Sequence, residues 1–155
     1  TMQYPLKSIQ WRYDTMTKKI LVAIDLEDTT MTERTLGIAS ELANLHGARV
    51  SLVYVATDLP PLVATHLPDD FESQNVTALS KQLKVLTKRF DLSSGQAKVF
   101  VRFGPIYREI LSQARSDSAD LIVIGCHKPG VTDFLLGSNA ARVARHATCS
   151  VYVVR

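Results

Sequence analysis

The sequence predicts a doubly wound α/β domain, in which helices cover both faces of a parallel sheet. Five short, largely apolar runs of strand length occur, at residues 20–24, 50–55, 97–101, 121–124 and 150–154. Runs that stay apolar instead of alternating indicate strands buried on both faces, as in parallel sheets. The segments between them repeat apolar residues every three or four positions, which is typical of amphipathic helices. Strands and helices that alternate in this way favour a parallel sheet with crossover helices.

The first helix is expected directly after the first strand. Thr30-Met-Thr-Glu33 has the form of a capping box, which predicts that a helix begins there. Gly47 predicts the end of this helix, because glycine is favoured just past a helix end. The expected buried stripe consists of Thr35, Ile38, Ala39, Leu42 and Leu45.

Three further helices are expected between the later strands. The second follows Asp69 and Asp70, with a buried stripe of Val76, Leu79, Leu83, Leu86 and Phe90. The third has Pro105 at its first position, where a missing N–H costs nothing. Its apolar face consists of Tyr107, Ile110, Leu111 and Ala114. Ser138 is expected to cap the last helix, which runs to about residue 147.

Length and composition fit one globular domain, with 155 residues, 46% hydrophobic and 21% charged. Residues 1–17 show no hydrophobic period and are expected to be an N-terminal extension of a domain at residues 18–155. The net charge, 18 − 15 = +3, indicates neither nucleic acid nor a membrane as partner. No apolar run is long enough to span a bilayer, and no secretory signal is visible. We therefore expect a cytoplasmic protein in which Cys126 and Cys149 remain free thiols.

Two segments near expected strand ends are candidates for a binding site. Ligands of open parallel sheets bind beyond the carboxyl ends of the strands, where the strand order reverses. Asp25 directly follows the first strand, and it is either a loop carboxylate or an acceptor for ribose hydroxyls or a water-bound metal. The segment 125–139 begins with Gly125 and reaches Gly137 and Ser138 at a helix start. Such a segment is either an anion-binding loop or an ordinary glycine-capped connection, and it matches neither the Walker nor the dinucleotide glycine pattern.

Several stretches resemble the universal stress protein family. They are Lys18-Lys-Ile-Leu-Val-Ala-Ile-Asp25, Ala119-Asp-Leu-Ile-Val-Ile-Gly125, Leu135-Leu-Gly-Ser-Asn-Ala-Ala141 and Arg145-His-Ala-Thr-Cys-Ser-Val-Tyr-Val-Val-Arg155. The last is most similar to the F/G-type branch, and the likeness covers residues 18–155. The resemblance implies an adenine nucleotide alpha hydrolase-like fold with strand order 3-2-1-4-5. Nucleotide-binding members carry the pattern G-2x-G-9x-G-[ST]. Here Lys128 stands at the second glycine, and the stretch to Gly137 is one residue shorter.

The resemblance also implies a ligand, site residues and partners. The ligand is ATP, or AMP or ADP, with or without Mg²⁺. The implied nucleotide-binding residues are Ala23, Ile24, Asp25, Val55, Gly125, Lys128, Gly137, Ser138 and Asn139. The implied assembly is a homodimer through strand five that can build homotetramers. We therefore expect an ATP-binding stress-response or regulatory protein.

Two alternatives remain open at this point. One is a slow ATPase or self-phosphorylating protein that uses Asp25, Lys128 or His127 around Mg²⁺. The other is a dimeric interaction module that binds no nucleotide. The sequence shows no carboxylate pair, Ser-His-Asp set or metal cluster, so it gives little support for an efficient enzyme.

Overall fold

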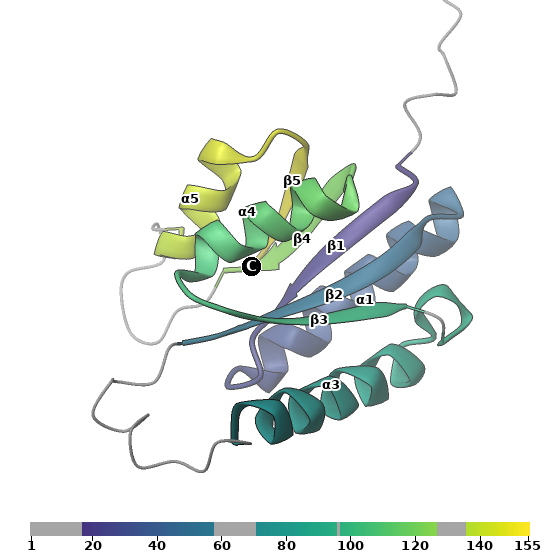
Figure 1. Cartoon of the computed structure of the whole chain (residues 1–155). Helices are drawn as coiled ribbons and strands as arrows, with labels where there is room; N and C mark the ends of the chain where they lie inside the picture. The colour runs from purple at the N-terminus through teal and green to yellow at the C-terminus, as the bar shows by residue number, and fades with distance from the viewer. Residues whose placement is uncertain (1–16, 58–70, 96, 127–135) are drawn as a thin grey trace, which may run out of the picture.

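The computed structural model describes residues 17–57, 71–95, 97–126 and 136–155; Lys128, His127 and residues 1–16 lie outside the described residues. Five parallel strands form one sheet in the order β3-β2-β1-β4-β5 (Figure 1). The strands are β1 (Lys19–Ile24), β2 (Arg49–Ala56), β3 (Lys98–Phe103), β4 (Leu121–Gly125) and β5 (Ser150–Val154). The helices are α1 (Thr29–His46), α3 (Phe71–Arg89), α4 (Ile106–Asp117) and α5 (Ser138–His146), with a short 3-10 helix η2 (Leu92–Gly95). The expected fold class and strand order are confirmed.

Two apolar clusters sandwich the sheet. On one face, α1 and α3 pack on the sheet, with Leu36 and Leu83 fully buried against alternate strand residues such as Val22. On the other face, α4 and α5 do the same, with Ile110 and Val143 buried. Side chains alternate between the faces of a strand, so a strand between two helix layers must be apolar at nearly every position. This burial explains the uninterrupted apolar runs of the sequence.

The strand order creates the position at which a ligand can enter. β1 lies at the centre, with β2 paired on one side and β4 on the other. Helix α1, which follows β1, lies on one face of the sheet, while α5, which follows β4, lies on the opposite face. In open parallel sheets, ligands bind at such a point, beyond the carboxyl ends of the strands. We call this edge of the sheet the carboxyl edge, and the opposite one the amino edge.

Helix α1 differs from the expected one at its start and on its surface. It begins at Thr29, and its N-cap is Asp28, whose Oδ1 accepts the Met31 N–H at 3.0 Å. Thr30 is therefore inside the helix and does not cap it. Leu45 is 75% exposed, although the spacing placed it on the buried stripe. Gly47 ends the helix as expected, in the left-handed conformation with φ 61°.

The starts of α4 and α5 each differ by one residue from expectation. Pro105 is the N-cap of α4, and Gly137, not Ser138, is the N-cap of α5. Cys126 and Cys149 are both free. Over the described part of the chain, helices of the length and apolarity needed to cross a membrane do not occur.

Candidate functional site

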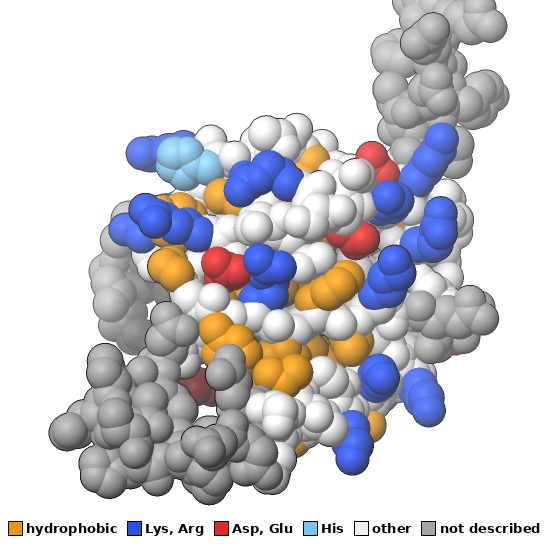
Figure 2. Space-filling view, in the orientation of Figure 1, with side chains coloured by type: hydrophobic (Ala, Val, Ile, Leu, Met, Phe, Trp, Pro, Cys, Tyr) orange, Lys and Arg blue, Asp and Glu red, His pale blue; other side chains and the backbone are white. Residues whose placement is uncertain are grey.

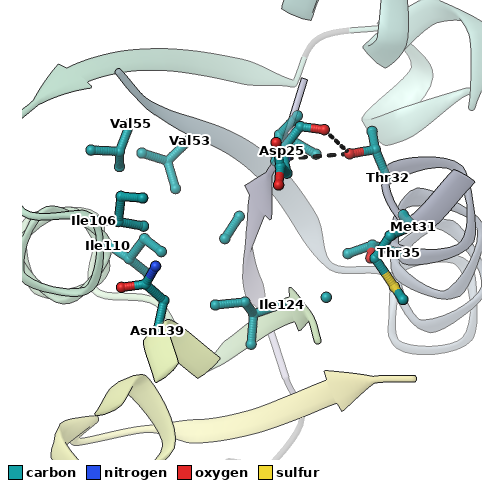
Figure 3. Close-up of a pocket in the computed structure, with 13 residues that line it drawn as sticks. Asp25, Met31, Thr32, Thr35, Val53, Val55, Ile106, Ile110, Ile124 and Asn139 are labelled. Atoms are coloured by element: carbon teal, nitrogen blue, oxygen red, sulfur yellow. Dashed lines mark hydrogen bonds between the residues drawn. The ribbon is translucent and has the colours of Figure 1, made fainter. Parts of the chain in front are cut away.

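A pocket lies at the carboxyl edge, between the ends of β1 and β4 (Figure 3). Its walls come from β1, β2, β4, α1, α4 and α5. The lining residues are Ala23, Ile24, Asp25, Met31, Thr32, Thr35, Val53, Val55, Ile106, Ile110, Ile124, Gly125 and Asn139. The described residues enclose about 110 Å³ here. Ligand sites typically enclose ~300–1,000 Å³, and residues 127–135 lie outside the described residues.

One wall of the pocket is apolar. Val53 and Val55 of β2 face Ile106 and Ile110 of α4, and Ile124 of β4 continues the surface (Figure 3). Val53, Val55, Ile110 and Ile124 are all buried in the core on that face of the sheet. Apolar walls with a few polar groups are typical of small-molecule sites. This wall is suited to a flat, weakly polar group such as a heterocyclic base.

The turn after β1 is fixed by hydrogen bonds around Asp25. The Thr32 hydroxyl donates to the backbone carbonyl oxygen of Asp25 at 2.6 Å, and the Asp25 N–H points at the same hydroxyl oxygen at 3.3 Å. The Asp25 carboxylate accepts the Glu27 N–H on Oδ1 at 3.0 Å. Asp25 thus stands in a defined position on the polar side of the pocket, beside α1 (Figure 3).

Gly125 allows α1 to approach the end of β4. A Cβ at this position would lie 2.5 Å from Cγ of Met31 and 3.2 Å from Oγ1 of Thr35. The first distance is far inside van der Waals contact, so the residue must be glycine for Met31 to take its place here. Glycine is needed for close packing here, and Gly125 has no positive φ.

The amino terminus of α5 forms the floor of the pocket, where Asn139 contributes its side chain. The N-cap is Gly137, and no side chain caps the helix. The Gly137 N–H instead donates to the Sγ of Cys126 at 3.2 Å, which joins the helix start to the end of β4. The first-turn N–H groups of a helix have no intrahelical acceptor and carry a partial positive charge. The floor is therefore suited to a negatively charged group.

Two other polar residues, Tyr54 and Arg102, lie near this edge. Tyr54 is partly buried near Glu27 and Asp25, and burial together with these carboxylates raises the pKa of its phenol above 10.0. Arg102, near the carboxyl end of β3, donates to Oε2 of Glu109 at 2.7 Å and to Oε1 of Gln113 at 3.1 Å. Arg102 therefore joins β3 to α4.

The structure brings most of the expected site residues together. Ala23, Ile24, Asp25, Val55, Gly125 and Asn139 line the pocket. Gly137 and Ser138 stand at the start of α5 but do not line it, and Lys128 lies outside the described residues. The described residues hold no group of three or more His, Cys, Asp or Glu side chains that could bind a metal.

Sequence reasoning missed the contributions of two helices. Met31, Thr32 and Thr35 come from the first turns of α1, and Ile106 and Ile110 come from α4. Thr32 and Thr35 are polar residues on the buried side of α1, which is the signal that could have indicated them. Ile106 and Ile110 carry no such signal, because their spacing is that of ordinary core residues.

The fold and the pocket together define a doubly wound α/β protein with its ligand pocket at the switch point of the sheet. The chain matches the model of the universal stress protein family over residues 16–155, and it belongs to this family. It is similar to universal stress protein G of Escherichia coli O157:H7, with 30% identity over 143 residues, 90% of this chain and 100% of that protein.

Solved structures show the same fold. A universal stress protein in complex with cAMP has a TM-score of 0.66 and 18% identity, and the match covers 90% of this chain and 98% of that one. A universal stress protein from Archaeoglobus fulgidus in complex with dAMP has a TM-score of 0.57 and 21% identity, covering 90% and 99%.

Proposed function

We propose that this chain is a stress-response regulatory module that binds an adenine nucleotide, ATP in the first place, in the pocket at the carboxyl edge. The observation that carries the proposal is the combination of groups in that pocket. An apolar wall, a fixed carboxylate and an uncapped helix start converge on one hollow. These correspond to the three parts of a nucleotide, namely base, sugar and phosphate.

Each part of the nucleotide has a partner in this proposal. The adenine lies against Val53 and Val55, with the backbone of Val55 at its edge. The Asp25 carboxylate accepts hydrogen bonds from the ribose hydroxyls. The phosphates lie toward Gly137, Ser138 and Asn139, because helix starts favour anions.

The segment between Gly125 and Gly137 completes the phosphate site in this proposal. Lys128 stands where the family's glycine pattern has its second glycine, and a lysine ammonium supplies a point charge for the outer phosphates. Mg²⁺ would accompany ATP, because this ion is usually held by one or two carboxylates together with substrate phosphates.

Relatives with bound ligands support the nucleotide class. The structures of family members described above hold cAMP and dAMP, and both compounds carry an adenine and a phosphate. In our proposal the nucleotide is a conformational ligand and is not turned over efficiently.

Replacement of Asp25 tests the proposal most simply. Asp25→Asn keeps an oxygen for the Glu27 N–H and replaces the second oxygen by a donor. We expect the affinity for ATP and for AMP to fall about ten- to a hundredfold, the worth of one charge-assisted hydrogen bond. Calorimetric titration measures both constants, and Glu41→Gln on the exposed side of α1 is the control. Unchanged ATP binding by Asp25→Asn would refute the assigned site.

The fate of bound ATP distinguishes the proposal from slow hydrolysis. Nucleotide is released by heat from protein incubated with ATP and is separated by anion-exchange chromatography. ATP that stays intact over hours supports a conformational ligand. Steady phosphate release would show instead that the protein is a slow ATPase. Failure of every adenine nucleotide to bind would favour an interaction module that binds no nucleotide.

We also propose that the chain forms a homodimer through β5 and that two such dimers can build a homotetramer. We propose the cytoplasm as its location. β5 is an edge strand of the sheet, paired with β4 on one side. Tyr152 on this strand is 44% exposed, and an open apolar edge is a template for further strand pairing.

A further inference from the structure

A second hollow lies at the amino edge of the sheet, at the end opposite to the nucleotide pocket. It is lined by Lys19, Arg49, Val50, Ser51, Ser93, Lys98 and Asp117, and it encloses about 380 Å³. This volume falls in the ~300–1,000 Å³ range of small-molecule sites. Figure 2 shows Lys and Arg side chains gathered on the side of the molecule where the strands begin, on the right of the view.

The strand register places three cationic residues on one face of the sheet. Lys19 of β1 pairs with Arg49 of β2, and Ser51 of β2 pairs with Lys98 of β3. Arg49 and Ser51 are two residues apart on one strand and so point to the same face. Lys19, Arg49, Ser51 and Lys98 therefore share the face that carries α4. Neighbouring strands are ~4.8 Å apart, so these like charges repel one another.

The protein itself compensates only part of this charge. The Lys19 ammonium donates to the backbone carbonyl oxygen of Asp117 at 3.0 Å, at the carboxyl-terminal end of α4, where a cation is favourable. The Asp117 carboxylate accepts the Ser51 hydroxyl at 2.5 Å. Within the described ranges, neither Arg49 nor Lys98 has an ion-pair partner. The lining side chains thus carry three positive charges against one negative charge.

Fixed hydroxyl groups form the base of the hollow. Ser51 is only 5% exposed and is held by Asp117. The Ser93 Oγ accepts the Val50 N–H at 2.8 Å, which leaves the hydroxyl proton of Ser93 as a donor. Ser93 has a positive φ of 48°, a conformation that serine adopts rarely and that holds the hydroxyl at this place.

The geometry points to a second ligand site at the amino edge, which takes a small, multiply charged anion of the phosphate class. An arginine fork and lysine ammonium groups are the preferred partners of phosphate oxygens. A serine hydroxyl adds a neutral donor. The site shares no lining residue with the nucleotide pocket, so it can be tested independently of nucleotide binding.

The full chain is first saturated with AMP and then titrated with inorganic pyrophosphate to test this site. The charge variant is Arg49→Gln with Lys98→Gln, both exposed positions. The control is Lys81→Gln with Lys84→Gln on α3, which removes the same charge from the other face. We expect roughly a ten- to a hundredfold weaker pyrophosphate affinity in the charge variant, and a change below about twofold in the control. An equal loss in both variants, or no saturable binding by the parent chain, overturns the proposal.

Amide chemical shifts of the parent chain give a second readout that does not depend on the variants folding. Pyrophosphate should shift the amides of Val50, Ser51 and Lys98. Shifts confined to Gly137–Asn139 would instead place the anion at the start of α5 and overturn the second site.

A sedimentation experiment with vesicles that contain phosphatidic acid distinguishes two sources of the phosphate group. Sedimentation of the parent chain but not of the charge variant identifies a lipid phosphate as the source. Pyrophosphate binding without sedimentation identifies a soluble compound.

Discussion

At the scale of single residues, the contact between Gly125 and Met31 decides the shape of the site. A methyl group on Gly125 would overlap Cγ of Met31 at 2.5 Å. We expect Gly125→Ala to lower the free energy of unfolding by about 1–3 kcal/mol, the usual cost of overpacking. In a Met31→Ala background the same change should cost less, because the clashing atoms are gone. Urea denaturation of the parent chain, the two single variants and the double variant measures the coupling between the two substitutions. Equal costs in both backgrounds would show that Met31 is not the obstacle.

Residues at strand ends could be predicted, whereas residues brought in by helix packing could not. Asp25 and Gly125 directly follow apolar runs, and the carboxyl ends of parallel strands meet at one edge. Met31, Ile106 and Ile110 reach the pocket only because α1 and α4 pack at particular positions along the sheet. Periodicity shows that such residues face the sheet but does not show which of them reach its edge.

At the scale of elements, the start of α1 depends on Asp28. Its carboxylate accepts the Met31 N–H, one of the first helical donors. Asp28→Ala should cost about 1 kcal/mol of stability, with an accepted range of ~0.5–2 kcal/mol for loss of an N-cap. Asp28→Ser is the matched control, because serine caps about as well as aspartate. Thermal or urea unfolding checks both variants, and equal losses from alanine and serine would contradict the capping role.

The boundaries of elements were harder to predict than the elements themselves. Asp28 and Thr30 are both residues that cap helices well, and the sequence pattern does not distinguish two such residues two positions apart. The helix begins at Thr29 because the carboxylate of Asp28 reaches the first turn. Leu45 follows Leu42 at three-residue spacing, yet repeated steps of three drift around a helix with 3.6 residues per turn. Leu45 therefore lies on the side of α1 opposite the buried Leu36 and is exposed.

At the scale of the whole molecule, the proposed dimer depends on the open side of β5. The Ser150 N–H donates toward β4, to the carbonyl oxygen of Asp120. Because backbone groups alternate along a strand, the N–H groups of Val151 and Val153 point away from β4. Val153→Pro therefore removes an outward donor, a place where an edge strand tolerates proline. We expect this variant to stay folded by circular dichroism and to lose the dimer in light scattering at micromolar concentration. A parent chain that is monomeric there would contradict the proposal.

The fold class could be predicted from the sequence because the apolar runs and the helical periodicity both indicate it. Apolar runs such as 121–124 are buried on both faces, and the helical stripes between them cover those faces. The strand order came from the resemblance to the family, since periodicity alone does not tell which strands are neighbours. The hollow at the amino edge was not predicted, because the strand order does not give the register that brings Lys19, Arg49 and Lys98 together.

A residue-resolved titration shows whether ATP binds at the carboxyl edge. Amide chemical shifts of the nucleotide-free chain are followed as ATP is added, with AMP in a parallel series. We predict shifts of Ala23, Val55 and Asn139 with both nucleotides, and unchanged amides of Ser51 and Lys98 in the AMP series. Shifts absent from the carboxyl edge at saturating ATP, or confined to the amino edge, would contradict binding in this pocket.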